Sequence, residues 1–209
     1  QLDWWVIEHA LNQLELWMKN NIYTHMSINV SSITFQQDDF VQKLLDIFDK
    51  YVHVVPELIS LELLETTALD NLEQISRKMK QCQKVGVQFS LDDFGTGYSS
   101  LSYLSKLPVN VLKIDQSFVR KMLVDKGNAS IVEGIIQLAE VFDRFVVAEG
   151  VEDRDVMQRL ITLGGEDAQG YFFSRPMPVD QLIEAIAQIE TLCLDSVSHG
   201  VRSGQTVTH

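Results

Sequence analysis

Apolar residues recur along the chain at two spacings, and these predict helices and strands in turn. Spacings of three and four residues, as from Trp4 to Ile7 to Leu11, predict amphipathic helices. Short apolar runs such as VQFSL predict buried strands. The predicted helices lie at residues 4–18, 40–48, 72–82, 99–105, 131–142, 157–161 and 179–189. The predicted strands are HMSINVS (25–31), ELISLELLETT (57–67), VQFSL (87–91), VNVLKID (109–115), FVVAEGVE (145–152) and AQGYFF (168–173).

Strand and helix alternate about six times, which predicts an α/β fold with a parallel sheet, either doubly wound or closed into a barrel. Every predicted strand ends in side chains able to hold a metal or a phosphate: Asn29, Glu62, Asp92 with Asp93, Lys113 with Asp115, Glu149 with Glu152, and Gln169. An open sheet concentrates its site at one switch point. Contributions from all strand ends favour a barrel, whose sites lie at the carboxyl ends of its strands.

Each of these residues also has a purely structural interpretation. Asn29 suits a turn, Glu65 a helix cap or loop, and Asp92 with Asp93 the start of the next helix. Glu62 lies in an apolar strand, where a salt bridge would relieve the cost of burying its charge. Lys113 is placed to pair with Asp115. In the predicted fold, several acids and a lysine would meet at one edge of the sheet. One shared site explains this gathering more simply than a separate structural role for each residue.

Composition narrows the ligands that such a site would take. The chain has 17 basic and 29 acidic residues, a net charge of -12, which disfavours DNA or RNA duplexes and anionic membranes. A small anion remains compatible where a local cation reverses the sign of the charge.

The two cysteines give no disulfide framework, which favours a reducing compartment. The chain begins without Met inside a helical pattern, so we expect a piece of a longer protein, and residues 191–209 suit a tail or linker.

Oxygen ligands without His or Cys favour Mg²⁺ or Mn²⁺. Two such cations ~3.5–4 Å apart hold a phosphodiester and generate a hydroxide nucleophile, and Lys113 would orient the attacking water. The loop after Asp93 contains Gly95 and Gly97 and is suited to close over a ligand. The residues alone leave a rival open, in which Lys113 abstracts a proton beside a carboxylate and one Mg²⁺ stabilises the enediolate.

Six segments, from about Leu2 to Ile189, resemble the ordered motifs of the EAL-type cyclic-di-GMP phosphodiesterases: INVS, LELLETT, LDDFGTGYSSL, LKIDQSFV, VVAEGVE and QGYFFSRPMP. The resemblance implies a TIM-like (β/α)8 barrel, with about six of its eight strands in residues 1–190 of this chain. It implies hydrolysis of cyclic di-GMP to linear pGpG with Mg²⁺ or Mn²⁺.

The resemblance also assigns roles to individual residues. It implies metal ligands at Asn29, Glu62, Asp92, Asp93 and Glu149. It implies catalytic roles for Lys113, Asp115, Glu149 and Gln169. It implies contacts with substrate or with the mobile loop at Asp93, Gly95, Thr96, Gly97, Tyr98, Ser99, Glu152, Arg175 and Pro176, with Glu152 anchoring the loop.

The motif that names the family lies on an earlier strand than any in this chain. We therefore expect one metal ligand to be missing here, which leaves open whether the chain alone is active. The alternative is an inactive cyclic-di-GMP receptor that signals through the loop after Asp93 and a dimer interface. The resemblance further implies a homodimer, a cytoplasmic domain even where the parent is membrane-anchored, and fusion to sensory or cyclase-like domains.

Overall fold

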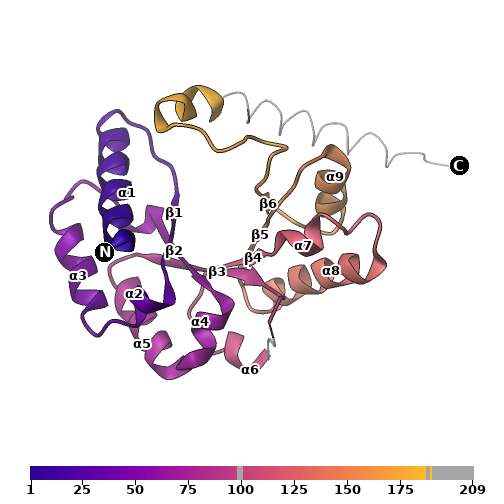
Figure 1. Ribbon diagram of the computed structural model, residues 1–209, viewed down its shortest axis with the longest axis horizontal. Coiled ribbons are helices and arrows are strands. Elements are labelled where there is room, and N and C mark those ends of the chain that lie inside the picture. Colours follow the sequence, from indigo (N-terminus) through magenta and orange to yellow (C-terminus); the bar gives the residue numbers. More distant parts are fainter. Residues whose placement is uncertain (98–100, 187–188, 190–209) are drawn as a thin grey trace, which may run out of the picture. The chain divides into compact units, whose positions relative to one another are not determined.

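The computed structural model describes residues 1–97, 101–186 and 189 (Figure 1). The chain divides into two compact units, and the boundary lies between Lys113 and Ile114. Each unit is described in turn. Among the described residues, no helix combines the length and apolar character needed to cross a membrane.

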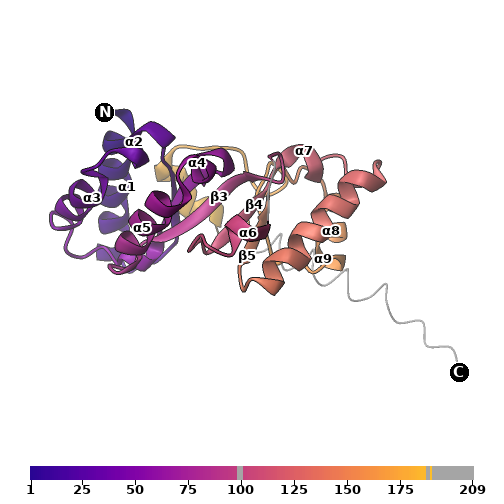
Figure 2. The ribbon, with the colours of Figure 1, turned by 90° about the horizontal axis from the view of Figure 1, so that it is seen from below.

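The first unit carries four strands, and a helix or turn follows each of the first three. Its elements are α1 (Leu2–Lys19), β1 (Met26–Asn29), α2 (Ser32–Gln36), α3 (Phe40–Phe48), η1 (Pro56–Leu58), β2 (Ile59–Leu64), α4 (Glu65–Asp70), α5 (Leu72–Gln83), β3 (Gln88–Phe94), α6 (Leu101–Leu104) and β4 (Val111–Ile114), the last residue of which opens the second unit. The helices α1, α3 and α5 lie together beside the strands (Figures 1 and 2).

The core of the first unit follows the predicted apolar spacing. Ile7, Leu11 and Leu14 are buried along one face of α1, as the three- and four-residue repeat predicts. The strand β2 is buried on both faces except at Ser60, which is half-buried, and Leu64, which is exposed, as a strand covered by helices requires. The ring of Phe35 contacts those of Phe40 and Phe89 edge to face, at centroid distances of 4.8 and 5.8 Å.

The strands are arranged in chain order, β1 to β6, and the β1–β2 and β2–β3 pairs are parallel. A doubly wound sheet reverses its strand order at a switch point, whereas a barrel does not. The prediction of an α/β fold of the barrel type with six strands is therefore confirmed. The register places Asn29 beside Glu62, and Asp92 two residues beyond the partner of Glu62. Because side chains alternate between faces, these three share one face of the sheet.

The second unit continues the same alternation. Its further elements are α7 (Gln116–Val119), α8 (Lys126–Val141), β5 (Phe145–Ala148), α9 (Arg154–Thr162) and β6 (Asp167–Ala168). The β5–β6 pair is parallel. Aspartates cap its two longer helices: the Asp125 carboxylate accepts from the N–H of Gly127 at 2.7 Å, and that of Asp153 from the N–H of Val156 at 2.9 Å.

Two predicted boundaries need correction. The prediction of a strand over AQGYFF is wrong, because β6 ends at Ala168. The N–H groups of Phe173 and Ser174 both donate to the carbonyl oxygen of Gly170, which closes a turn where the apolar letters indicated a strand. The last helix covers residues 179–186, and residues 187–188 of its predicted range lie outside the described residues. Periodicity also missed α2, α4 and α7, which are too short to show a repeat.

Candidate functional site

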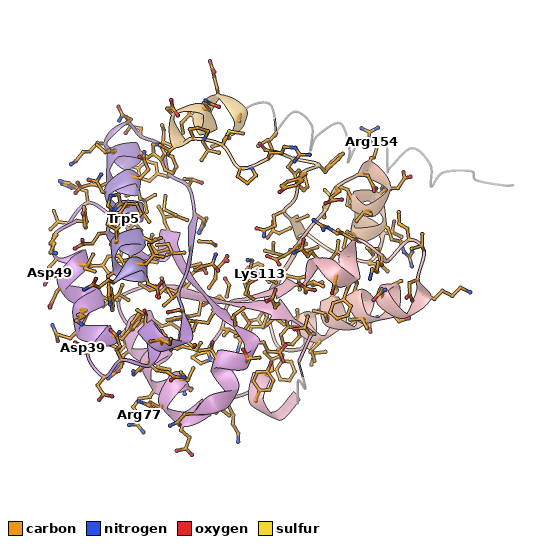
Figure 3. All side chains as sticks on the ribbon, viewed as in Figure 1. Trp5, Asp39, Asp49, Arg77, Lys113 and Arg154 are labelled. Carbon is orange, nitrogen blue, oxygen red and sulfur yellow. The ribbon has the colours of Figure 1, made fainter. Side chains whose placement is uncertain are left out.

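A buried lysine lies between two carboxylates at the carboxyl end of the first unit's strands. Lys113 on β4 is labelled in Figure 3. It donates from Nζ to Oε2 of Glu62 on β2 at 2.7 Å and to Oδ1 of Asp92 on β3 at 3.0 Å. The side chains of Lys113 and Glu62 are only 6% and 7% exposed. Since each strand contributes one member, the parallel order of the sheet assembles the cluster from residues far apart in sequence.

Asn29 completes the oxygen donors on this face. It is the last residue of β1, is exposed, and is paired in register with Glu62. The next residue, Val30, donates its N–H to the carbonyl oxygen of Glu62 at 3.0 Å. One amide and two carboxylates stand beside one ammonium, a net charge of about -1 that favours a cation. Hard oxygen donors without thiol or imidazole fit Mg²⁺ or Mn²⁺.

The loop after β3 is held by a buried glutamate that we did not predict as a site residue. Asp93 and Gly95 adopt positive φ angles of 55° and 98°, which turns the chain sharply after Asp92. The Gly95 N–H donates to Oε2 of Glu65 at 3.1 Å. A Cβ on Gly97 would lie 3.0 Å from Oε1 of Glu65, so glycine permits this close approach. Glu65 is 1% exposed and opens α4 three residues after Glu62.

Other loop predictions have mixed outcomes. The hydroxyl of Thr96 donates to the carbonyl oxygen of Asp93 at 2.9 Å, which tightens the turn. Tyr98 and Ser99 lie outside the described residues. Glu152, expected to anchor the loop, lies in the second unit and pairs there with Arg120 at 2.7 Å. Among the described residues, Glu65 supplies a carboxylate that contacts the loop, and the anchoring role of Glu152 stays a prediction.

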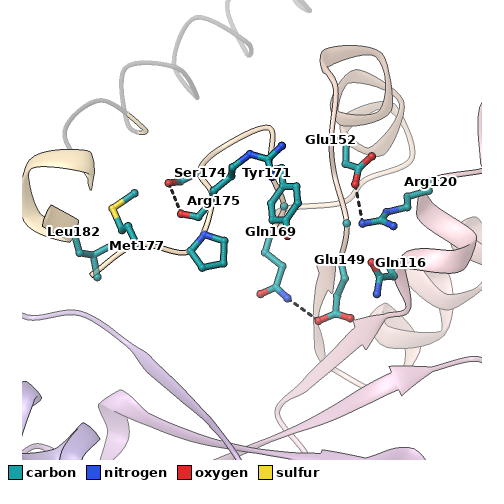
Figure 4. A pocket seen from close by; sticks show the side chains of 13 residues that line it. Gln116, Arg120, Glu149, Glu152, Gln169, Tyr171, Ser174, Arg175, Met177 and Leu182 are labelled. Carbon is teal, nitrogen blue, oxygen red and sulfur yellow. Dashed lines mark hydrogen bonds and ion pairs between the residues drawn. The ribbon is translucent and has the colours of Figure 1, made fainter. Parts of the chain in front are cut away.

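The second unit has a pocket of about 480 Å³ beside the end of β5 (Figure 4). Its lining residues are Gln116, Arg120, Glu149, Gly150, Glu152, Gln169, Gly170, Tyr171, Ser174, Arg175, Pro176, Met177 and Leu182. The amide of Gln169 donates to Oε1 of Glu149 at 2.7 Å. The guanidinium of Arg175 lies 4.4 Å from the ring centroid of Tyr171, a cation–π contact. The predicted residues Glu149, Glu152, Gln169, Arg175 and Pro176 thus line one pocket.

The lining residues that were not predicted include Gln116, Arg120, Tyr171 and Met177. Each lies within or next to a motif that supplied predicted residues, and that proximity is the only sequence signal for them. Asp115 does not belong to the cluster that contains Lys113, two residues earlier in the sequence. Its carboxylate caps α7 by accepting from the N–H and hydroxyl of Ser117, while Lys113 pairs with Glu62 and Asp92. A catalytic role for Asp115 stays a prediction.

The two sets of residues belong to different units. Asn29, Glu62, Asp92, Asp93 and Lys113 lie in the first, and the pocket around Glu149 lies in the second. Each set has the residue types that bind a phosphodiester: oxygen ligands for divalent cations in the first, guanidinium and amide donors in the second. That the two sets act on one substrate stays a prediction.

Comparison with known proteins decides the family. The family model described as the EAL domain matches residues 1–176. The chain belongs to the EAL-domain family.

Curated members of this family are much longer than the chain. The Signaling protein YkoW of Bacillus subtilis is 35% identical over 184 residues, which are 88% of this chain and 23% of YkoW. The Bifunctional diguanylate cyclase/cyclic di-GMP phosphodiesterase MucR of Pseudomonas aeruginosa is 34% identical over 188 residues, 90% of this chain and 27% of MucR. The chain therefore spans about a quarter of the length of these two relatives.

Solved EAL structures share the fold. The MucR phosphodiesterase in complex with cyclic di-GMP matches with a TM-score of 0.84 and 34% identity, covering 87% of this chain and 74% of that one. The EAL domain of Mycobacterium smegmatis DcpA matches with a TM-score of 0.82 and 34% identity, covering 90% and 85%. The EAL domain described here is therefore related to cyclic-di-GMP phosphodiesterases in both sequence and structure.

Proposed function

We propose that this EAL domain hydrolyses cyclic di-GMP to linear pGpG with Mg²⁺ or Mn²⁺ as cofactor. The observation that carries the proposal is the cluster of Glu62, Asp92 and Lys113, in which an ammonium is buried between two carboxylates at the ends of parallel strands. Its relative MucR carries this activity in its name and is 34% identical. The family's fold and the donor chemistry of this chain support the same function.

The residues that would hold the cations are Asn29, Glu62, Asp92, Asp93 and Glu149. Bound divalent cations would stabilise charge on the phosphodiester and ease deprotonation of the attacking water. Lys113, with its ammonium fixed by two carboxylates, would orient that water and balance phosphate charge. The Gln169 amide would hold the Glu149 carboxylate in one orientation.

The pocket of the second unit would take part of the nucleotide. Arg175 stacks on Tyr171 and presents its guanidinium, which suits a phosphate oxygen or a base edge. Arg120 is already paired with Glu152 and is therefore fixed in direction. Pro176 and Met177 add apolar surface against which a purine could pack. Gly95 and Gly97 would let the loop after Asp93 move over the bound ligand.

The test is turnover of cyclic di-GMP by the full-length protein that contains this chain. With Mg²⁺ or Mn²⁺ we expect pGpG as the product, separated by ion-exchange chromatography. Changing Glu149→Gln should abolish turnover and leave the protein folded. A matched control is Glu140→Gln, an exposed acid on α8 outside the pocket, which should keep full activity. Tight cyclic-di-GMP binding without turnover would instead support the receptor function.

The proposal extends to partners and location. Because the curated relatives are multidomain proteins, we expect this domain to be joined to sensory or cyclase-like domains. We also propose a homodimer in the cytoplasm, with the loop after Asp93 near the dimer interface. Light scattering of the purified protein tests the dimer, and a monomer at all concentrations would contradict it.

A further inference from the structure

A second pocket lies in the first unit, on the outer side of its helices. It measures about 810 Å³ and is lined by Asn71, Leu72, Glu73, Ser76, Arg77, Lys80, Ser105 and Lys106. None of these is among the candidate site residues. Figure 3 shows Arg77 pointing outward from α5, away from Lys113. The pocket is therefore separate from the cluster of Glu62, Asp92 and Lys113.

The charge of this pocket is opposite to that of the chain. It has three cations, Arg77, Lys80 and Lys106, and one carboxylate, Glu73, whereas the whole chain carries a net charge of -12. The cations Arg77 and Lys80 are three residues apart on α5 and so share a face of the helix. Lys106 joins them from the turn after α6. The pocket therefore concentrates positive charge on a concave surface.

The cations of this pocket contrast with three paired lysines elsewhere in the first unit. Lys19, Lys43 and Lys50 each form an ion pair with an acidic side chain at 2.8–2.9 Å. Within residues 1–97, 101–186 and 189, no ion pair involves Arg77, Lys80 or Lys106. Glu73 is the one acidic side chain among the lining residues, so three cationic groups face one space with a net charge of about +2.

Hydrogen bonds fix the walls of the pocket. The hydroxyl of Ser76 donates to the carbonyl oxygen of Lys106 at 3.0 Å, which ties the turn after α6 to α5. The side chain of Asn71 caps α5 by accepting from the N–H of Gln74 at 3.3 Å. Ser76 is buried at 8% exposure, so it forms a floor rather than a flexible edge. These bonds thus fix the backbone of α5 and of the turn after α6, which bear the three cationic side chains, before any ligand binds.

We propose that this pocket binds a small phosphate-bearing molecule. Phosphate oxygens accept from guanidinium and ammonium groups, and three such groups match a phosphate or pyrophosphate better than a single carboxylate. The volume lies in the range of about 300–1,000 Å³ that small-molecule sites occupy. Nucleic acid does not fit as the ligand, because the net charge of -12 repels a long polyanion.

The probe is pyrophosphate, titrated by calorimetry into the protein without divalent cations, so that the metal-dependent site stays out of the measurement. We expect saturable binding that weakens as salt rises. The double variant Arg77→Gln/Lys80→Gln should weaken binding at least tenfold. The matched control Lys43→Gln/Lys50→Gln removes the same charge from residues outside the pocket and should change binding less than twofold. Circular dichroism confirms that both variants are folded.

Three results would overturn the proposal. The first is an absence of saturable binding to the unaltered protein. The second is an equal loss of affinity in the pocket variant and the control, which would show a diffuse charge effect. The third is a glutamate octapeptide that binds this pocket more tightly than pyrophosphate, which would identify an acidic peptide as the ligand class.

Discussion

Replacing Lys113 with Met tests whether the two carboxylates beside it form a cation site. The substitution keeps an unbranched apolar stem and removes the ammonium that lies 2.7 Å from Glu62 and 3.0 Å from Asp92. Removing one partner of a buried ion pair costs about 3–5 kcal/mol. Asp92 is 18% exposed, so water can partly solvate the carboxylate left without its partner, and we expect a value of about 3 kcal/mol, near the lower end. For a domain of this size that is a fall in Tm of about 6–12 °C.

The assay is urea unfolding of Lys113→Met and the unaltered protein, each in EDTA and in Mn²⁺. Mn²⁺ should stabilise the variant more than the unaltered protein, because the cation then has no ammonium to compete with. Ligand at 100 times its Kd adds about 2.7 kcal/mol. Lys50→Met is the control, since its ion pair with Glu8 is 60% and 40% exposed and an exposed pair contributes little to stability.

Adding Glu62→Gln to Lys113→Met should recover part of the lost stability in EDTA, because it removes one of the two carboxylates left unpaired. The reasoning is refuted if Lys113→Met is as stable as the unaltered protein in EDTA. It is also refuted if Mn²⁺ stabilises both proteins equally.

Three further predictions concern other buried groups of the first unit. Lys78→Met should lower the free energy of unfolding by about 2–3 kcal/mol in urea titrations. The buried Lys78 ammonium donates to the carbonyl oxygens of residues 35, 36 and 37, at the end of α2, at 3.1, 2.8 and 2.6 Å. An unchanged unfolding midpoint would contradict this prediction. Glu65→Ala should reduce turnover at least tenfold with a smaller loss in Glu65→Gln, since glutamine can still accept from the Gly95 N–H; equal activity in both variants would contradict it. Burial raises the pKa of Cys82 from 9.0 to about 12, so in a Cys193→Ser background the folded protein should react with a thiol reagent at pH 8 on the order of 10³-fold more slowly than the unfolded chain. Comparable reaction rates of folded and unfolded chains with the thiol reagent would contradict the burial of Cys82. Because the folded pKa of Cys82 exceeds the unfolded one, the stability linked to this thiol is full below about pH 9 and is lost as pH rises towards 12.

The long elements were predictable because burial dictates their sequence. The repeat from Ile7 to Leu11 to Leu14 predicts α1, and the apolar run around Phe89 predicts β3. Short elements such as α7 were not predictable, since four residues hold no full repeat. The strand prediction for the segment after Ala168 was wrong for another reason. Its apolar residues suggest a strand, but its backbone hydrogen bonds close a turn at Gly170.

The candidate site shows a similar division. Polar residues at strand ends could be found because they interrupt apolar runs, and Glu62 and Lys113 do meet in the structure. Sequence did not reveal which acid pairs with Lys113, because strand register and side-chain direction decide that, and the nearby Asp115 caps α7. Glu65 was missed because its role depends on the loop after β3, 30 residues away in sequence.

Anomalous scattering from crystals of the full-length protein grown with Mn²⁺ and cyclic di-GMP tests the central claim most directly. The claim is that the carboxylates of Glu62 and Asp92 bind a divalent cation beside a phosphate of the nucleotide. The account predicts a Mn²⁺ peak in contact with both carboxylates, next to a phosphate of the nucleotide. Mn²⁺ bound elsewhere, or nucleotide bound with these carboxylates far from it, would contradict the account.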